Sequence, residues 1–283
     1  MNAANVWFVT GASQGLGLLL TQKLIQEGYR VAATSRKLET LVKEIGPASD
    51  QFLPLQVSLT EPASVQQAVA QTIATFGRID VVVNNAGYGQ FGTLEELSDE
   101  EARKNFDINV FGSLNVIREV MPHLRNQQSG HIFNIASIGG YTANFAGWGI
   151  YCATKFAVAG FTESLAAEAK SFGIHATVVY PGYFRTNFLT QESMATPARR
   201  IEAYAEAQAS LSAHREDING NQPGDPAKAV AALITVATTP NPPLHLFLGS
   251  DAYGMMQEKM AAVQVDVEAW KDLTLSTDFS TEV

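Results

Sequence analysis

A tyrosine and a lysine four residues apart form the pair in this sequence best suited to moving a proton. Tyr151 and Lys155 lie in the stretch GIYCATK, and residues i and i+4 share one face of a helix. A free phenol, with a pKa of about 10, is a poor base at neutral pH. A cation within about 4–6 Å favours the phenolate, so we predict that Lys155 lowers the pKa of Tyr151. The plainer alternative is a packed tyrosine beside a solvated lysine.

Three glycines near the start of the chain could cradle a phosphate. Gly11, Gly15 and Gly17 occur in TGASQGLG, directly after the strand-like run VWFVT and at the start of a helical pattern. Glycine permits a tight turn and lets a pyrophosphate approach the backbone, while the helix N-terminus offers free N–H groups. The third glycine lets helix and strand pack closely. This context favours a dinucleotide site over turn glycines that bind nothing.

The end of the second predicted strand indicates which dinucleotide. An NAD site usually has an acidic residue there, which binds the ribose 2′-hydroxyl. This chain reads AATSRKLET, with Ser35, Arg36 and Lys37 in place of the acid. Arg36 could bind a 2′-phosphate that a carboxylate would repel. We therefore predict NADP(H), with NAD possible; the alternative for Arg36 is an ordinary solvated residue before a helix.

Elements of alternating type must position these residues. Strand-like runs occur at 6–10, 30–35, 51–57, 79–85, 130–137, 175–181 and 244–248, and helical patterns at 15–28, 61–76, 98–125, 149–172 and about 251–270. Several strands are continuously apolar, as in a sheet covered on both faces. The alternation predicts an α/β fold, a Rossmann-like doubly wound parallel sheet of about seven strands in one domain over 1–283. The stretch 188–226 interrupts it as a partly helical excursion, and a polar tail follows the last helix.

Composition excludes several classes of protein. The 283 residues carry a net charge of −9, which argues against a nucleic-acid partner. No apolar run reaches a membrane span, and the N-terminus lacks a secretory pattern. Cys152 is the single cysteine, which fits a reducing compartment, and we expect a cytoplasmic protein. The five histidines show no metal-binding spacing, so we expect no metal site.

Several motifs in order resemble those of the short-chain dehydrogenase/reductase family. They are TGASQGLG, NNAG at 84–87, Asn109 in a helix, Ser137 after a strand, Tyr151-x-x-x-Lys155, and PGYFRT at 181–186. The resemblance covers roughly residues 5–190 and extends loosely to about 250. Each motif stands at the expected end of its element, which makes the set more specific than any one of them.

The resemblance implies a role for each matched residue. Tyr151 would be the general acid in carbonyl reduction or the base in alcohol oxidation. Ser137 would orient the substrate oxygen, and Lys155 would hold the nicotinamide ribose. Asn109 would position a water that connects Lys155 to solvent. The expected cofactor contacts are Gly11, Ser13, Gln14, Gly15, Leu16, Gly17, Ser35, Arg36, Gln56, Val57, Asn85, Ala86, Gly87, Tyr151, Lys155, Pro181, Gly182 and Thr186.

Three departures from the family pattern change local expectations. The Ser137–Tyr151 spacing is one residue longer than in close relatives, so the 138–150 loop is expected to be re-shaped. Gln56 replaces an Asp that contacts adenine, and Gln14 replaces a basic residue of NADP-preferring relatives. Cys152 beside Tyr151 is interpreted as a small buried helix residue rather than a reactive thiol.

Aromatic residues near the expected centre favour a small hydrophobic carbonyl or alcohol as substrate. They are Tyr88, Phe91, Phe145, Trp148, Tyr183, Phe184 and Phe188, and about half are expected to be core. The segment 188–226 is either a substrate lid or a surface hairpin. In relatives, helices such as 98–125 and 149–172 pair between subunits, so a homodimer or homotetramer is expected.

The sequence leaves three functions open. The first is an NADP(H)-dependent oxidoreductase. A non-catalytic dinucleotide-binding regulatory protein is the alternative, although it would need no phenol. A dinucleotide-dependent epimerase or dehydratase would usually have a GxxGxxG turn and a larger C-terminal domain.

Overall fold

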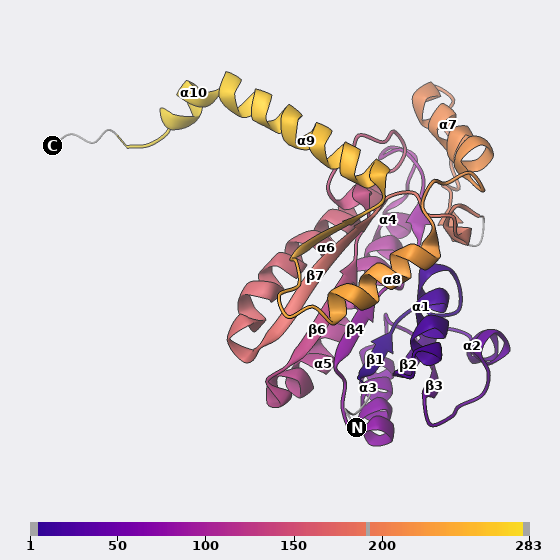
Figure 1. Cartoon of the computed structure of the whole chain (residues 1–283). Coiled ribbons are helices and arrows are strands. Elements are labelled where there is room, and N and C mark those ends of the chain that lie inside the picture. Colours follow the sequence, from indigo (N-terminus) through magenta and orange to yellow (C-terminus); the bar gives the residue numbers. More distant parts are fainter. Residues whose placement is uncertain (1–4, 191–192, 280–283) are drawn as a thin grey trace.

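Seven parallel strands form the centre of the protein. The structure, a computed structural model, describes residues 5–190 and 193–279. Its main sheet has the order β3-β2-β1-β4-β6-β7-β9 (Figure 1). The strands are β1 (Val6–Val9), β2 (Arg30–Ser35), β3 (Phe52–Gln56), β4 (Val81–Asn84), β6 (Gly130–Ile135), β7 (Ile174–Pro181) and β9 (His245–Leu248). The predicted Rossmann-like α/β class is confirmed.

Helices cover both faces of this sheet. One face packs on α1 (Gly15–Gln26), α2 (Leu38–Ile45) and α8 (Pro226–Ala237). The other packs on α3 (Pro62–Phe76), α5 (Gly112–Gln127) and α6 (Gly149–Ala169). With a helical layer on each side, the central strands become apolar throughout, and β1 and β4 are buried along their length.

The strand order reverses at the centre of the sheet. From β1 the chain proceeds outward to β2 and β3, then returns to place β4 on the other side of β1. The loops after β1 and β4 therefore diverge at the carboxyl edge of the sheet. Ligands of open α/β sheets bind at such a point.

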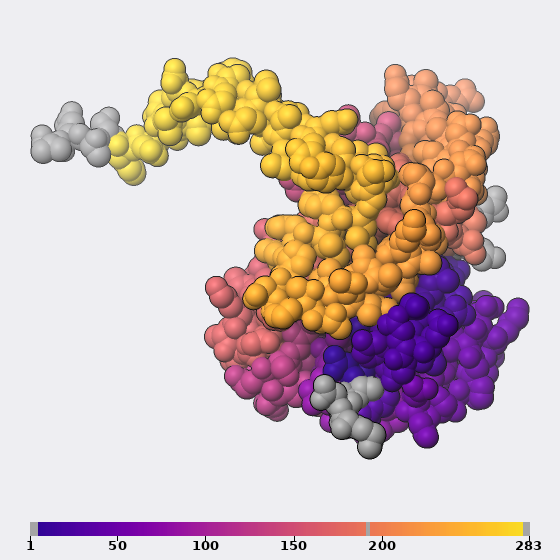
Figure 2. Space-filling view, in the orientation of Figure 1, coloured from indigo at the N-terminus to yellow at the C-terminus, as the bar shows by residue number. Residues whose placement is uncertain are grey.

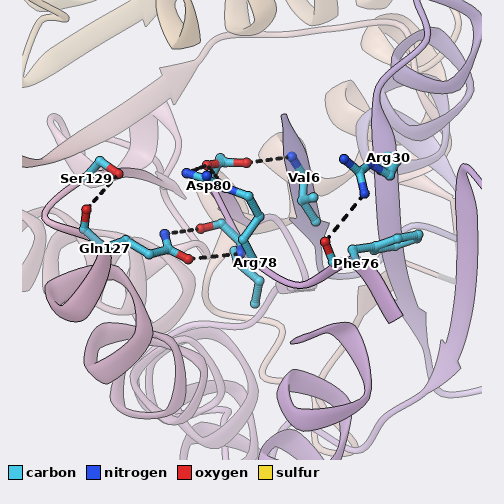
Figure 3. A network of polar contacts seen from close by, with 8 residues as sticks. Val6, Arg30, Phe76, Arg78, Asp80, Gln127 and Ser129 are labelled. Carbon is cyan, nitrogen blue, oxygen red and sulfur yellow. Dashed lines mark hydrogen bonds and ion pairs between the residues drawn. The ribbon is translucent and has the colours of Figure 1, made fainter. Parts of the chain in front are cut away.

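A polar network closes the opposite, amino edge of the sheet (Figure 3). The Asp80 carboxylate accepts the Val6 N–H at 2.8 Å and pairs with Arg78 at 2.6 Å. The Gln127 side chain donates to the Ile79 carbonyl at 2.7 Å and accepts from the Ile79 N–H at 3.4 Å. These bonds join β1, the segment before β4 and the end of α5.

Several elements differ from the sequence prediction. Helix α2 lies where a helix was expected after Arg36, although its bounds were not predicted. Helix α8 was not predicted, although Asp225 caps it by accepting from Ala227 N–H and Pro226 begins it. The helix expected over 98–125 is divided into α4 (Asp99–Phe106), a π-helical turn η1 (Asp107–Phe111) and α5. Strand β6 ends at Ile135, so Ser137 lies in the loop beyond it, before the short 3₁₀ turn η2 (Ile138–Gly140).

The excursion after β7 is partly helical, as predicted. It contains a 3₁₀ turn η4 (Asn187–Leu189), α7 (Ala205–Ser212) and a π-helical turn η5 (Ala213–Ile218). It also forms a small parallel sheet that was not predicted, in which β8 (Met194–Ala195) pairs with β5 (Gly89–Gln90). Residues 191–192 of the excursion lie outside the described part of the chain.

The last helices leave the body of the protein. The long α9 (Ser250–Ala269) and the short α10 (Lys271–Leu275) extend outward from β9, as Figure 2 shows in yellow. The polar tail predicted after about residue 270 therefore begins as a helix instead. In the described part of the chain, every helix is too short or too polar to span a bilayer.

Candidate active site

A cavity of about 590 Å³ lies at the carboxyl edge of the sheet, where the strand order reverses. Most of the predicted site residues line it: Gly11, Ser13, Gln14, Gly15, Leu16, Ser35, Arg36, Val57, Asn85, Ala86, Gly87, Ser137, Tyr151, Lys155, Pro181, Gly182 and Thr186. Three of them, Gly17, Gln56 and Asn109, do not line the cavity. The structure thus brings the glycine turn and the Tyr–Lys pair to one space.

The glycine turn has the backbone geometry that its sequence suggests. Gly11 and Gly15 have φ of +65° and +57°, which favours residues without a Cβ. A Cβ on Gly17 would lie 2.5 Å from the carbonyl oxygen of Gly11, so this glycine allows close packing. No side chain caps the N-terminus of α1, which leaves its dipole end for an anion. This cradle fits the pyrophosphate of a dinucleotide.

Asn85 fixes the loop after β4 to that turn. Its side-chain amide donates to the carbonyls of Thr10 and Gly11 at 2.9 and 3.0 Å. The Thr10 hydroxyl in turn accepts the N–H groups of Asn85 and Ala86. The carboxamide of Asn85 therefore shapes the cavity wall from within the protein.

The basic end of β2 borders the same cavity. Arg36 is exposed and lines it, while the buried Ser35 accepts the Lys37 N–H at 3.2 Å. Gln56 is exposed outside the lining, and its amide donates to the Arg36 carbonyl at 3.2 Å. Gln56 thus supports the backbone of Arg36, whose side chain remains available for an anion.

The Tyr151 hydroxyl is governed by burial rather than by Lys155. Burial raises the pKa of Tyr151, and a side-chain hydrogen bond with Ser137 lowers it by less. Lys155 lies with Nζ 5.8 Å from the centroid of the Tyr151 ring and donates to the Ile135 carbonyl at 2.8 Å. The prediction that Lys155 lowers the phenol pKa is therefore wrong for this geometry. Burial lowers the pKa of Lys155 itself to about 8.

Asn109 acts on the cavity through the backbone of Tyr88. It lies in the π-helical turn η1, and its amide donates to the Tyr88 carbonyl and to the Thr154 hydroxyl at 3.1 Å each. Its oxygen accepts the Tyr88 N–H at 3.0 Å. A Cβ on Gly87 would approach this oxygen within 3.0 Å. Asn109 therefore joins the loop after β4 to α6.

The segment after β7 forms the third wall. The Asp251 carboxylate, in the first turn of α9, accepts the Tyr183 N–H at 2.6 Å. A Cβ on Gly182 would collide with this carboxylate, which explains the glycine. Thr186 faces the glycine turn, since a Cβ added to Gly15 would lie 3.9 Å from the Cβ of Thr186.

Comparison with known proteins identifies this arrangement. The family model described as short chain dehydrogenase matches residues 5–196. The chain belongs to the short-chain dehydrogenase family. The cavity and its remaining residues therefore belong to an oxidoreductase of this family.

Relatives and solved structures share this fold over most of their length. A 3-ketodihydrosphingosine reductase from Bacteroides thetaiotaomicron is 36% identical over 85% of this chain and 86% of its own. A short-chain dehydrogenase from Streptomyces avermitilis is 36% identical, with a TM-score of 0.89 over 98% of this chain and all of its own. A closed serine dehydrogenase complexed with NADP⁺ is 26% identical, with a TM-score of 0.72 over 86% and 94% of the two chains.

The excursion after β7 gives this short-chain dehydrogenase a residue that the sequence analysis missed. His214 lines the cavity, and its Nε2 lies 2.9 Å from the Tyr183 hydroxyl. Its Nδ1 lies 2.7 Å from the Ser210 carbonyl and so carries the proton. Burial lowers the His214 pKa, and the neutral ring accepts from Tyr183. A lone histidine after an Ala-rich helix gave no signal of this pairing.

Another bond connects the excursion to the glycine turn. The Gln14 amide donates to the Ser193 hydroxyl at 2.8 Å, although 179 residues separate them. Gln14 thus holds the excursion of this short-chain dehydrogenase to the glycine turn. Of the seven predicted aromatics, Tyr88, Phe145, Trp148, Tyr183, Phe184 and Phe188 line the cavity, whereas Phe91 is buried against Trp148.

Cys152 lies against the same wall and is buried. Burial raises its pKa to about 11, so it remains a thiol at neutral pH, as the interpretation of a buried helix residue expects. Within residues 5–190 and 193–279, no three His, Cys, Asp or Glu side chains gather as a metal site would require.

Proposed function

We propose that the protein is an NADP(H)-dependent oxidoreductase that transfers a hydride between nicotinamide and a hydrophobic carbonyl/alcohol pair. The main support for this proposal is that the glycine turn lines one wall of a cavity and that another wall contains Ser137, Tyr151 and Lys155. A protein that only sensed a dinucleotide would need the turn but not the phenol.

Arg36 and Ser35 support NADP(H). No carboxylate lies at 33–38, and Arg36 borders the cavity with its guanidinium unpaired by any described carboxylate. The 2′-phosphate of NADP would find a cation there. The serine dehydrogenase of similar fold is complexed with NADP⁺. Gly11, Gly15 and the N-terminus of α1 would hold the pyrophosphate, and NAD would use the same cradle.

When bound, the nicotinamide cofactor would supply the hydride, and the chain would supply the proton. Ser137 would orient the carbonyl oxygen of the substrate, and Tyr151 would donate its hydroxyl proton to that oxygen. The phenol of Tyr151, whose pKa burial raises further, holds its proton at neutral pH, as donation to a carbonyl oxygen requires. Lys155 would hold the nicotinamide ribose, and Asn109 would position the water that returns a proton through Lys155.

The cavity walls support a hydrophobic substrate. Phe145, Trp148 and Phe188 present apolar rings on the side of Tyr151. One relative is named as a reductase of 3-ketodihydrosphingosine, which is a keto compound. We therefore assign a hydrophobic ketone or aldehyde rather than a small charged acid.

The chain would form one domain, in which the excursion over 188–226 would act as a lid over the cavity. Phe188, Ser193 and His214 come from it and line the cavity, and Gln14 and Tyr183 hold it to the body. Closure would exclude water during proton transfer. We further propose a cytoplasmic homo-oligomer, as the single buried cysteine and the family resemblance favour.

The test is consumption of NADPH absorbance with a panel of aliphatic, aromatic and steroid-like ketones. We expect turnover with at least one hydrophobic ketone and none with small keto acids. NADPH binding by fluorescence, with no turnover on any carbonyl, would instead identify the non-catalytic regulatory protein.

A further inference from the structure

The projecting helix α9 carries an apolar stripe that the body does not cover. Ala252 is the one buried residue of α9. Its stripe consists of Tyr253, Met256, Met260, Val263 and Val267 and continues to Trp270 directly after the helix; these six residues are hereafter the seam. Except for the half-buried Met256, these side chains are between 43% and 64% exposed. Most of the stability of a helix in a protein comes from the packing of its apolar face, so the uncovered seam of α9 indicates a partner surface.

The spacing of the seam is that of a coiled coil. Successive members are three, four, three, four and three residues apart, which places them at positions a and d of a heptad. This series reads the same in both directions. A second copy of the helix, running antiparallel, would therefore set Tyr253 against Trp270, Met256 against Val267, and Met260 against Val263.

The charges beside the seam match the same arrangement. Of the three g positions within α9, Ala252, Lys259 and Asp266, the last two are charged. In an antiparallel pair, g positions face each other, so Lys259 of each copy would meet Asp266 of the other. The pair would thus contain two attractive contacts and no like charges at g.

The shape of the molecule permits this geometry. Figures 1 and 2 show α9 leading away from the body, with open space along its length. Its 20 residues span about 30 Å, so antiparallel helices would place the two bodies at opposite ends. A membrane surface fits less well, since Asp251, Glu258, Asp266 and Glu268 outnumber Lys259 in this helix.

We propose that α9 is a dimerisation arm that pairs antiparallel with α9 of a second copy of this chain. This interface is separate from the α5 and α6 faces expected from the family resemblance, and it does not depend on the proposed reaction. If copies of the chain also assemble through α5 and α6, pairing of the α9 arms would double the number of subunits in that assembly.

The decisive experiment makes the same Val→Glu substitution at two positions and compares the variants by light scattering after size-exclusion chromatography. Val263→Glu puts one carboxylate from each copy into the centre of the seam, opposite Met260 of the other copy, and is expected to halve the mass of the assembly. Val265→Glu makes the same change at the outer f position, where the side chain is 68% exposed, and should keep the wild-type mass. An unchanged mass for Val263→Glu, or the same loss for both variants, overturns the proposal. Circular dichroism checks that both variants remain folded.

A charge exchange tests the direction of the helices. Lys259→Asp should raise the dissociation constant about tenfold, and the double variant Lys259→Asp, Asp266→Lys should restore it. Parallel helices would instead pair Asp266 with Lys271 and Lys259 with Gln264. Lys259→Asp alone would then have little effect, and the double variant would be weak. That result would overturn the antiparallel arrangement.

Discussion

The two edges of the main sheet use polar side chains in opposite ways. At the amino edge, Asp80, Arg78 and Gln127 direct their polar atoms at one another and at the backbone. At the carboxyl edge, Ser137, Tyr151 and Arg36 border a cavity of about 590 Å³. The same strands thus end in a closed network on one side and an open site on the other. We expect changes at the amino edge to alter stability and changes at the carboxyl edge to alter chemistry.

The largest effect should come from the carboxyl edge. Tyr151→Phe removes the proton that the mechanism needs, and we expect kcat to fall by about 10³-fold or more. The ring keeps its packing, so NADPH affinity and the melting temperature should stay near wild type. Steady-state kinetics and a fluorescence titration measure both quantities. Near-normal turnover would remove Tyr151 from its assigned role.

Arg36→Glu should change the cofactor preference. A carboxylate facing a 2′-phosphate would raise the KM for NADPH by about tenfold or more and leave the KM for NADH nearly unchanged. Lys37→Glu is a matched control, because Lys37 carries the same charge but does not line the cavity. Equal effects of both variants would show that net charge, rather than contact, decides the preference.

At the amino edge, Asp80→Ala should cost about 2 kcal/mol of unfolding free energy, because it leaves the Val6 N–H without its acceptor. The kcat of the folded protein should not change. Asp99→Ala is the control: its pair with Arg103 is exposed, so its loss should cost under about 1 kcal/mol. Urea unfolding and an assay on one sample separate the two effects. A loss of kcat without a loss of stability would break the contrast between the edges.

The smallest effect is a pH dependence contributed by Lys155. Its pKa of about 8 in the folded protein lies below the usual 10.5. The unfolded chain therefore binds more protons between these values, and stability should rise with pH in that window. From pH 8 to pH 9 the gain is at most about 1 kcal/mol. Urea unfolding of wild type and Lys155→Met should show a gain that only wild type has; parallel curves would contradict it.

The sequence was most informative where a residue type has few alternatives. Apolar runs that alternate with helical patterns predicted all seven strands of the main sheet. The central strands are apolar throughout because helices cover both faces of the sheet. Positive φ angles at Gly11 and Gly15 match a turn that other residues enter at a cost. Most of the predicted site residues line the cavity, and the resemblance to the family, rather than backbone geometry, pointed to them.

The parts that the sequence did not show depend on long-range contacts. His214 reaches Tyr183, and Ser193 reaches Gln14, only because the excursion folds back over the sheet. The pKa of Tyr151 could not be predicted either, since the i,i+4 spacing shows neither its burial nor the Ile135 carbonyl that binds Lys155. Helix α2 has no side-chain cap at Lys37, so its start has no local signal.

Asp251 has a consequence for anyone who shortens this protein. It belongs to the outward helix, yet its carboxylate holds the main chain of Tyr183 beside the cavity. Deleting the whole helix would release that wall, and lost turnover would then be mistaken for a need to assemble. A cut placed after the first two turns, beyond Met256, would keep the acceptor while removing most of the seam.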